Sequence, residues 1–343
     1  MKKIIGAGLL LISSISWGQD IHFTQVNEFE MLLNPAMTGV FDGWERVGAN
    51  HKNQWVGAGT KYFTTSVAGD VNFFKPKRGD RAHMGLGVQF YNDIGGDSKF
   101  GTKQFNLNLS AIVPLAEQHE ISAGLQFGVA QRTGDLTNLL FSNQFNGTTL
   151  DPTINPMENN NLVSFVYPDL TAGLAYHFGN HSVGFDRDDK TEFRFGVAYF
   201  HLNRPQLNYR VGYSEKLYAK LVIHADFQKD FAGTNSGVEA FAYQFMQGPH
   251  NETLLGAMYR YRLTDGTKTT GLKRDMYLKM GAAWRINDAI APIVYFHLGS
   301  FNFGVSYDIT ISALGNQARS GGLEFSLMYT NLDFALFKGR GRM

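Results

Sequence analysis

Two groups of acidic and histidine residues have types that could bind a metal ion. Asp186, Asp188 and Asp189 resemble part of a calcium loop, but the glycine turn and the distal glutamate of an EF-hand are missing. His177 and His181 lie at the end of a predicted strand, where a spacing of four does not place two side chains on one face as it does in a helix. The sequence therefore predicts no metal site and no cofactor.

Two further patterns bear on enzymatic chemistry. His297 and Ser300 could belong to a hydrolase, but no acid is placed to orient the histidine, and the serine falls in a predicted turn. The Gly85-Leu86-Gly87 run lacks the third glycine and the following helix of a dinucleotide-binding loop. We therefore predict no catalytic residue, and the chain is not expected to be an enzyme.

The composition excludes several other classes. Lys and Arg number 31 against 30 Asp and Glu, a net charge of +1, so no overall field points toward nucleic acid. The absence of cysteine excludes disulfides, thiolate metal sites and a lipid-anchored lipoprotein. The chain nevertheless has 38 Gly, 28 Phe and 15 Tyr, with a mean hydropathy of only -0.20. Many aromatic residues at low overall hydropathy suit a wall with one apolar face.

The first residues are typical of an export signal. Lys2 and Lys3 precede an apolar run over 4–12, and Ser16-Trp17-Gly18 supplies small residues for cleavage. The run is too short to cross a hydrocarbon core of about 30 Å as a helix. We predict a signal peptide over 1–18 and a mature chain that starts at Gln19.

The clearest structural signal is a strict alternation over 104–113. Gln, Asn and Ser side chains alternate there with Phe, Leu, Ala and Val. A period of two is typical of a β-strand. A strand with amides and hydroxyls on one face and hydrocarbon on the other fits between a wet lumen and lipid.

The alternation recurs along the chain and predicts one all-β domain over 19–343, a transmembrane antiparallel β-barrel of about 14 strands. The predicted strands lie near 45–56, 63–73, 85–90, 104–113, 121–129, 170–178, 193–199, 221–227, 238–247, 254–259, 276–286, 290–298, 301–307 and 323–329. The alternative is a soluble β-sandwich, whose strands also alternate. The polar face here is rich in Gly, Ser, Asn and Gln rather than in charged residues, which favours the barrel in the outer membrane.

The C-terminal third allows finer predictions. A charge on the lipid side would cost roughly 2–4 kcal/mol near mid-membrane, so Lys279 and Arg285 are expected to face the lumen. Keeping the apolar face in register requires an odd-length turn at 287–289 and a two-residue turn at Gly299-Ser300. Pro292 removes a ladder donor inside a strand, and we expect a β-bulge there.

Two of the segments outside the predicted strands stand out. Residues 133–167 form the longest break, punctuated by Asp-Pro and Asn-Pro pairs, and a loop of this length is usually functional or disordered. If both chain ends are periplasmic, this loop is extracellular. Residues 19–43 are predicted to be a periplasmic N-terminal segment, and the pattern leaves open whether they plug the lumen.

Several short motifs give the chain a family resemblance. They are Phe23-Thr24-Gln25, Leu33-Asn34-Pro35-Ala36, Gly39, Asn53-Gln54-Trp55-Val56-Gly57, Gly85-Leu86-Gly87, Asn92-Asp93, Tyr167-Pro168-Asp169 and Phe303-Gly304-Val305-Ser306-Tyr307-Asp308. With these motifs the sequence resembles, nearly end to end, the PorP/SprF family of type IX secretion outer-membrane proteins of Bacteroidetes. The second and fourth motifs are the specific ones.

The resemblance implies an integral outer-membrane component of type IX secretion or gliding motility. Its implied partners are subunits of the secretion machinery, a secreted cell-surface adhesin and outer-membrane lipid. The candidate motif and partner residues are Asn34, Pro35, Asn53, Gln54, Trp55 and Gly57. A channel for small hydrophobic or polar solutes, and a membrane-embedded lipase that uses Ser300, are the alternatives.

The residues themselves leave the roles of two motifs open. Leu33-Asn34-Pro35-Ala36 is a turn in which proline fixes φ and asparagine caps, and it is either an entry into the first strand or a contact surface. Trp55 is either an anchor at the membrane interface or a partner contact.

Overall fold

The computed structural model describes residues 21, 23–54, 62–75, 81–135, 139–157, 164–180, 190–210, 213–264, 274–312 and 321–332. Its barrel strands are β1 (Glu45–Gln54), β2 (Tyr62–Phe73), β3 (His83–Gly95), β4 (Phe100–Ala116), β5 (His119–Thr133), β6 (Phe165–Asn180), β7 (Thr191–Phe200), β10 (Lys220–Asp230), β11 (Ser236–Gln247), β12 (His250–Thr264), β13 (Met276–Arg285), β14 (Ala289–Leu298), β15 (Phe301–Thr310) and β16 (Gly322–Asn331).

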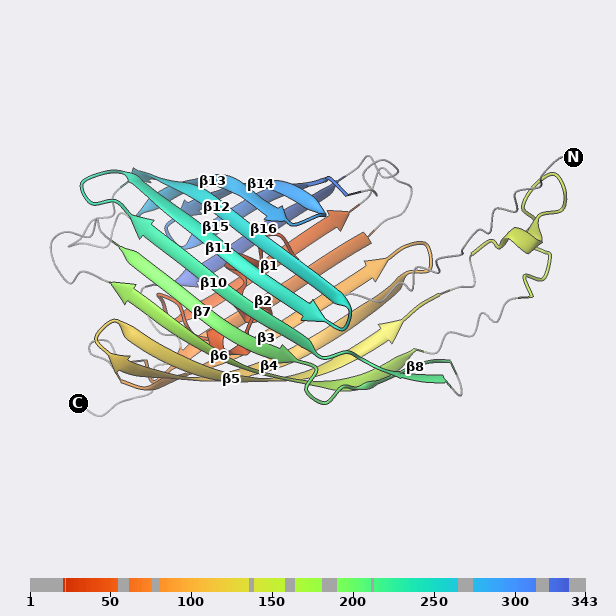
Figure 1. Ribbon diagram of the computed structural model, residues 1–343, viewed down its shortest axis with the longest axis horizontal. Helices are drawn as coiled ribbons and strands as arrows, with labels where there is room; N and C mark the ends of the chain where they lie inside the picture. Colours follow the sequence, from red (N-terminus) through yellow and green to blue (C-terminus); the bar gives the residue numbers. More distant parts are fainter. Residues whose placement is uncertain are drawn as a thin grey trace, which may run out of the picture.

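These 14 strands form one closed antiparallel barrel, as predicted (Figure 1). Consecutive barrel strands pair with each other, and β1 pairs with β16 from Glu45↔Asn331 to Gln54↔Gly322, which closes the sheet. No helix among the described residues is long and apolar enough to span a membrane. A single closed sheet rules out the soluble sandwich.

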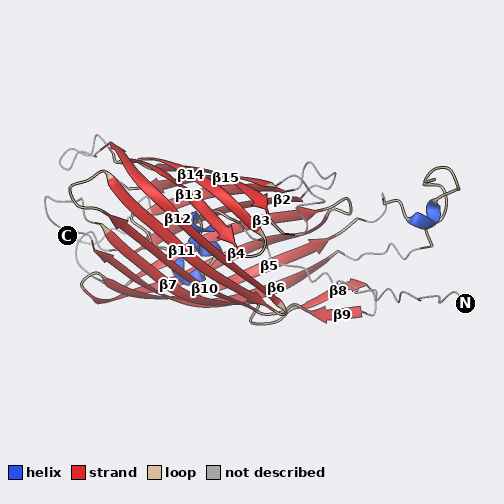
Figure 2. Ribbon diagram, turned by 45° about the horizontal axis from the view of Figure 1, so that its top comes forward, coloured by secondary structure: helices blue, strands red, loops and turns tan. Residues whose placement is uncertain are grey.

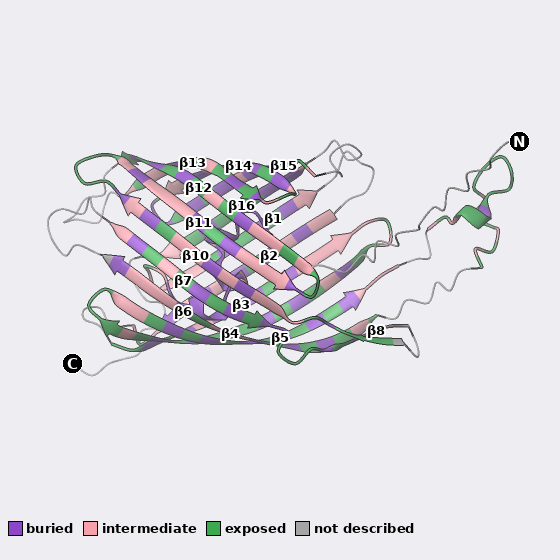
Figure 3. Ribbon diagram, viewed as in Figure 1, coloured by how far each residue is buried: buried purple, intermediate pink, exposed green. Residues whose placement is uncertain are grey.

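The two faces of the wall differ as the alternation predicts. On β4, Phe105 is 52% exposed whereas its neighbour Asn106 is 1% exposed, and Figure 3 shows the same alternation of buried and exposed positions along the other strands. The outward side chains of the strands are mainly apolar, and most polar side chains of the wall point into the lumen. Because a closed barrel pairs its own backbone, it can sit in lipid, and this outward apolar belt is that of an outer-membrane protein.

The C-terminal turns follow the register argument. A three-residue turn at 286–288 joins Arg285 to Ala289, one position earlier than predicted but of odd length. Leu298 pairs directly with Phe301 across Gly299-Ser300, and Gly299 has the positive φ of 67° that this tight turn requires. The bulge expected at Pro292 is wrong: the pairs Ile290↔Ile309 and Ile293↔Ser306 keep one register, so the missing N–H interrupts the ladder without shifting it.

The long break lies at one end of the barrel, which we call the loop end. It runs between β5 and β6 and contains the 3₁₀ turn η5 (Ser142–Gln144). The same end carries a separate hairpin of β8 (Gln206–Arg210) and β9 (Tyr213–Lys216), in a segment that the sequence analysis treated as a plain loop. This hairpin packs through Leu207 and Leu217 on Ala130 and Tyr167 of the β5–β6 extension.

The N-terminal segment lies inside the barrel (Figure 2). It contains three 3₁₀ turns, η1 (Val26–Glu28), η2 (Glu30–Leu32) and η3 (Pro35–Met37). This finding corrects the assignment of 19–43 to the periplasm, for its described residues from Phe23 to Val40 are almost all buried against the inner wall. We call residues 23–43 the plug.

Candidate functional site in the barrel lumen

The plug crosses the lumen from the loop end to the opposite end. Thr24 bonds to Asp308, near the loop-end terminus of β15. Gly39 donates its N–H to Asp70 at 2.9 Å, near the opposite end of the wall, where β2 finishes and β1 begins. The chain therefore passes through the barrel before it builds the first strand.

At the loop end, the backbone of the plug is held by a carboxylate. The N–H groups of Thr24 and Gln25 each donate to one oxygen of Glu324 at 2.8 Å. The Gln25 amide also donates to Ser306 Oγ at 3.0 Å. Hydrogen bonds to a charged group are stronger than neutral ones, so this contact fixes the start of the plug on β15 and β16.

The same carboxylate belongs to a buried cluster that we call the charged anchor: Lys52, Arg285, Asp308 and Glu324. Lys52 Nζ lies 2.9 Å from Asp308 and 4.0 Å from Glu324, and Arg285 lies 3.4 Å from Asp308. Arg285 also donates to Thr24 Oγ1 at 3.0 Å. The anchor joins β1, β13, β15 and β16 to the plug, and Arg285 also pairs with Glu252 and Asp288.

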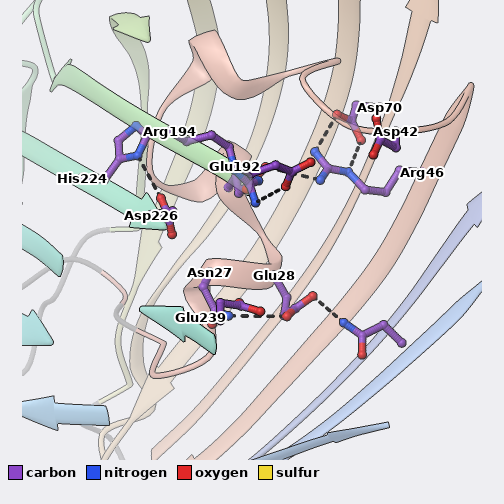
Figure 4. A network of polar contacts seen from close by, with 12 residues as sticks. Asn27, Glu28, Asp42, Arg46, Asp70, Glu192, Arg194, His224, Asp226 and Glu239 are labelled. Atoms are coloured by element: carbon purple, nitrogen blue, oxygen red, sulfur yellow. Dashed lines mark hydrogen bonds and ion pairs between the residues drawn. The ribbon is translucent and has the colours of Figure 1, made fainter. Parts of the chain in front are cut away.

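Lys279 also faces the lumen. Its ammonium lies 3.3 Å from Glu28 of the plug and 2.9 Å from Glu239 of β11, and Asn302 donates to the other oxygen of Glu28. Figure 4 shows Glu28 and Glu239 within the network of polar contacts in the lumen. Lys279 and Arg285 thus lie on the inner face and contact the plug there.

A further ion-pair group holds the plug near the opposite end. Arg46 forms hydrogen bonds of 2.9 Å to both oxygens of Asp70 (Figure 4) and lies 3.5 Å from Glu30 of the plug. Arg194 of β7 pairs with the same Glu30. Glu30 therefore bridges β1 and β7 across the lumen.

Asn34 and Pro35 begin the last turn of the plug. The Asn34 side chain accepts a 2.9 Å hydrogen bond from the Ala36 N–H, and Pro35 fixes φ at the first position of η3. The Asn34 amide then donates to Leu174 O at 2.9 Å and lies 3.1 Å from His224 Nε2. The motif makes a turn and also contacts the wall, so it is more than an entry into β1.

The inner wall that faces this turn has glycine at several inward positions. Gly85, Gly87, Gly124, Gly173 and Gly196, here called the glycine wall, are inward positions of β3, β5, β6 and β7. A Cβ at Gly124 would overlap the backbone of Pro35 and Ala36, and one at Gly173 would overlap the Asn34 amide. The plug approaches this closely because no side chain stands between the two backbones.

Alternating glycine at neighbouring inward positions was the sequence signal for this contact. Of the glycine wall, the sequence analysis named only Gly85 and Gly87, as an incomplete dinucleotide-binding pattern and as part of a family motif. The structure shows what crowds them, since a Cβ at Gly85 would meet the backbone of Thr38.

An apolar cluster fills the remaining side of the lumen. Phe23, Val26 and Leu33 of the plug pack there. The wall contributes Ala198, Phe200, Val222, Phe241, Tyr243, Leu254, Met258, Ala283, Ala291, Ile293 and Tyr295. On β12, Leu254 and Met258 face inward, and Leu255 and Tyr259 face outward.

A small cavity remains between the plug and the wall at the loop end. Its volume is about 40 Å³, and its lining includes Phe23, Gln89, Gln126 and Asp169. The carboxamide oxygens of Gln89 and Gln126 are buried without a hydrogen-bond partner. Such a volume holds about three water molecules, far less than a continuous pore.

Asn53 and Gln54 lie at the loop end of β1, paired with Phe63 and Tyr62 of β2. They directly follow Lys52 of the charged anchor. Trp55 and Gly57, the other two candidate residues of that motif, lie outside the described residues, as do the predicted signal peptide at 1–18 and the Asp186, Asp188 and Asp189 group.

The described histidine and serine residues that were candidates for chemistry make structural contacts or lie in a turn. His177 Nδ1 lies 3.2 Å from Glu120, His297 contacts the Tyr277 ring at a centroid separation of 5.7 Å, and Ser300 lies in its turn. Among the described ranges, no group of three or more His, Asp or Glu residues could hold a metal ion.

The structure is similar to several solved structures at TM-scores below 0.5. The CymD monoaromatic hydrocarbon channel has a TM-score of 0.46 at 10% identity, with 88% of this chain and 92% of that chain covered. The outer membrane protein Omp33 of Acinetobacter baumannii has a TM-score of 0.43 at 8% identity, with 84% and 98% covered. The β domain of the Bordetella autotransporter BrkA has a TM-score of 0.42 at 12% identity, with 84% and 100% covered.

No protein with a curated description matches the sequence. The family model for the type IX secretion system membrane protein PorP/SprF, however, matches residues 15–329, nearly the whole length. The motifs of the plug and of the first strand fall within this match. The chain therefore belongs to the PorP/SprF family of type IX secretion system membrane proteins.

Proposed function

We propose that this protein holds an exported cell-surface protein, an adhesin, and connects it to the type IX secretion and gliding machinery in the outer membrane. In this role it works through its solvent-exposed ends, and it is neither an enzyme nor a solute channel. The observation that carries the proposal is the plug, which contacts the inner wall on every side of the lumen.

The energetics of the plug support a holding role over transport. Moving the plug aside breaks the ion pairs of Glu28 and Glu30 and the hydrogen bonds that the Thr24 and Gln25 N–H groups donate to Glu324. Removing one partner of a buried ion pair typically costs about 3–5 kcal/mol. A small solute that binds weakly in the lumen does not offset several such losses.

The rim at the loop end supports an outward-facing contact. The longest loop and the β8–β9 hairpin both stand at that end (Figure 1), and loops that carry binding sites are positioned by rigid scaffolds in this way. We place this end outside the cell and the opposite end in the periplasm, toward the machinery.

A deletion strain tests the role directly. Surface proteins are labelled on intact cells and quantified in the parent, the deletion strain and the complemented strain. We expect at least one exported surface protein to disappear from the cell surface and to return on complementation. Normal secretion and display of every surface protein in the deletion strain would sink the proposal.

Planar-bilayer recordings test the solute-channel alternative. The full chain is compared with a variant that lacks residues 23–43, and we expect sustained conductance only from the shortened chain. Equal, stable conductance from both proteins would favour a channel, because the plug would then not obstruct the lumen.

A further inference from the structure

The loop between β5 and β6 carries a compact unit of its own. Residues 141–157, here called the knob, stand beyond the end of the barrel (Figure 1). The buried Gln144 side chain accepts from the Phe141 N–H at 2.8 Å and donates to Ile154 O at 2.7 Å. The Asp151 N–H returns to Gln144 O at 2.9 Å. These bonds tie the two arms of the loop together.

The tip of the knob is also ordered by short-range hydrogen bonds. Asn146 Oδ1 accepts from the N–H groups of Thr148 and Thr149 at 3.0 and 2.9 Å, and Phe145 and Leu150 pair across an isolated antiparallel bridge. A preformed surface loses little conformational entropy when it binds. The knob is thus built before any partner arrives.

The knob presents apolar side chains to solvent. Phe145 is 54% exposed and Leu150 is 46% exposed, and their position as bridge partners puts both side chains on one face. Met157 is 89% exposed. These residues lie away from the lipid-facing belt, so lipid does not account for them. A group of exposed apolar side chains, unlike a single one, is a feature of interaction sites.

The charge of the loop narrows the class of partner. Residues 134–164 contain no Lys, Arg or His and include Asp135, Asp151 and Glu158. The outer leaflet of such a membrane presents anionic groups, and like charges repel. A membrane surface is therefore disfavoured, and a protein surface with a basic rim around an apolar centre is favoured.

We propose that the knob is the docking site for the exported surface protein, which covers Phe145, Leu150 and Met157 with an apolar patch rimmed by Lys or Arg. This inference rests on the proposed function and adds the contact surface and the chemistry of the partner. The lumen and the plug take no part in the contact.

The test uses the full chain in cells and the surface protein that the deletion strain loses. A variant with Phe145→Ser, Leu150→Ser and Met157→Ser is expected to fold as a barrel, because these side chains are exposed. We expect it to retain that surface protein at least about tenfold less well than the parent, as for loss of a central apolar contact. A matched variant at the opposite end is Phe74→Ser, which removes an apolar side chain 80% exposed, and it should retain the protein normally.

A pair of substitutions at one exposed position tests the charge. Thr148→Lys is expected to weaken retention severalfold, whereas Thr148→Glu should leave it unchanged or strengthen it. Binding of the purified proteins in detergent should show the same order and should lose this charge difference at high salt.

The outcomes separate the two proposals. If the deletion strain loses a surface protein but the triple-serine variant displays it normally, the knob is not the docking site and the holding role stands. If Thr148→Lys instead raises binding to vesicles that contain anionic outer-leaflet lipid, and retention of the surface protein is unaffected, the knob is a membrane contact. Normal display in the deletion strain would remove both proposals.

Discussion

The plug meets the barrel in two contrasting ways. On β1, β13, β15 and β16 it is held by charges, and Lys52, Arg285, Asp308 and Glu324 surround Thr24 and Gln25. On β3, β5, β6 and β7 it lies against bare backbone, because the wall positions are glycine. The first contact depends on complementary charge and the second on close fit. Substitutions in the two contacts should therefore destabilise the plug in different ways.

The largest effect is expected from the charged anchor. Lys52→Met removes the cation beside Glu324 and leaves Asp308 with Arg285 alone, and we expect about 3–5 kcal/mol lower stability of the plug contact. Protease sensitivity of the plug and thermal unfolding in detergent measure it. Lys103→Met, an exposed position on β4, is the control. Equal behaviour of the two variants would show that the anchor does not hold the plug.

Steric fit at the glycine wall comes next. Gly124→Ala puts a methyl group where Pro35 and Ala36 now lie, and we expect a cost of about 1–3 kcal/mol from overpacking. Ala123→Val adds bulk one residue away on the lipid side and should be neutral. Since the change carries no charge, its effect should not depend on salt, and a strong salt dependence would contradict the close-fit account.

Asn34 separates capping from wall contact. Asn34→Asp keeps an acceptor for the Ala36 N–H but loses the amide donors to Leu174 O and Val197 O, whereas Asn34→Ala loses both. We expect the alanine variant to destabilise the plug by about 1–2 kcal/mol. The aspartate should be at least as costly if the wall contact dominates, since it buries a charge. Full recovery by aspartate would mean that capping alone matters. Hydrogen exchange of the plug amides is the measurement.

The smallest effect is expected at the edge of the barrel opposite the loop end. Lys190 lies 3.1 Å from Asp42, whose side chain is more than half exposed. Burial lowers the pKa of Lys190, but the Asp42 and Glu192 carboxylates outweigh it and hold the pKa above its ordinary value, so the pair stays charged at neutral pH. Asp42→Asn should cost under about 1 kcal/mol, and a difference that persists at about 1 M salt would contradict a screened surface pair. Thermal unfolding at low and high salt is the readout.

The wall could be predicted from sequence, and the plug could not. Alternation over 104–113 shows which side chains face lipid because a strand has a fixed period of two, and the cost of charge in lipid turns Lys279 and Arg285 inward. The hydrogen bonds of Thr24 and the ion pairs of Glu28 and Glu30 join residues up to hundreds of positions apart, such as Thr24 and Glu324, and nothing local encodes them. Short β8 and β9 were missed because four or five residues with a register shift give no periodic signal.

The pairing of β1 with β16 has a consequence for biogenesis. The carboxylate that receives the backbone of Thr24 and Gln25 lies on β16, 300 residues after Thr24 in the sequence. Its neighbour across the β1–β16 pairing is Lys52, so this contact with the plug is complete only when the same pairing closes the barrel. A chain that ends before Glu324 would lack both the closure and this contact.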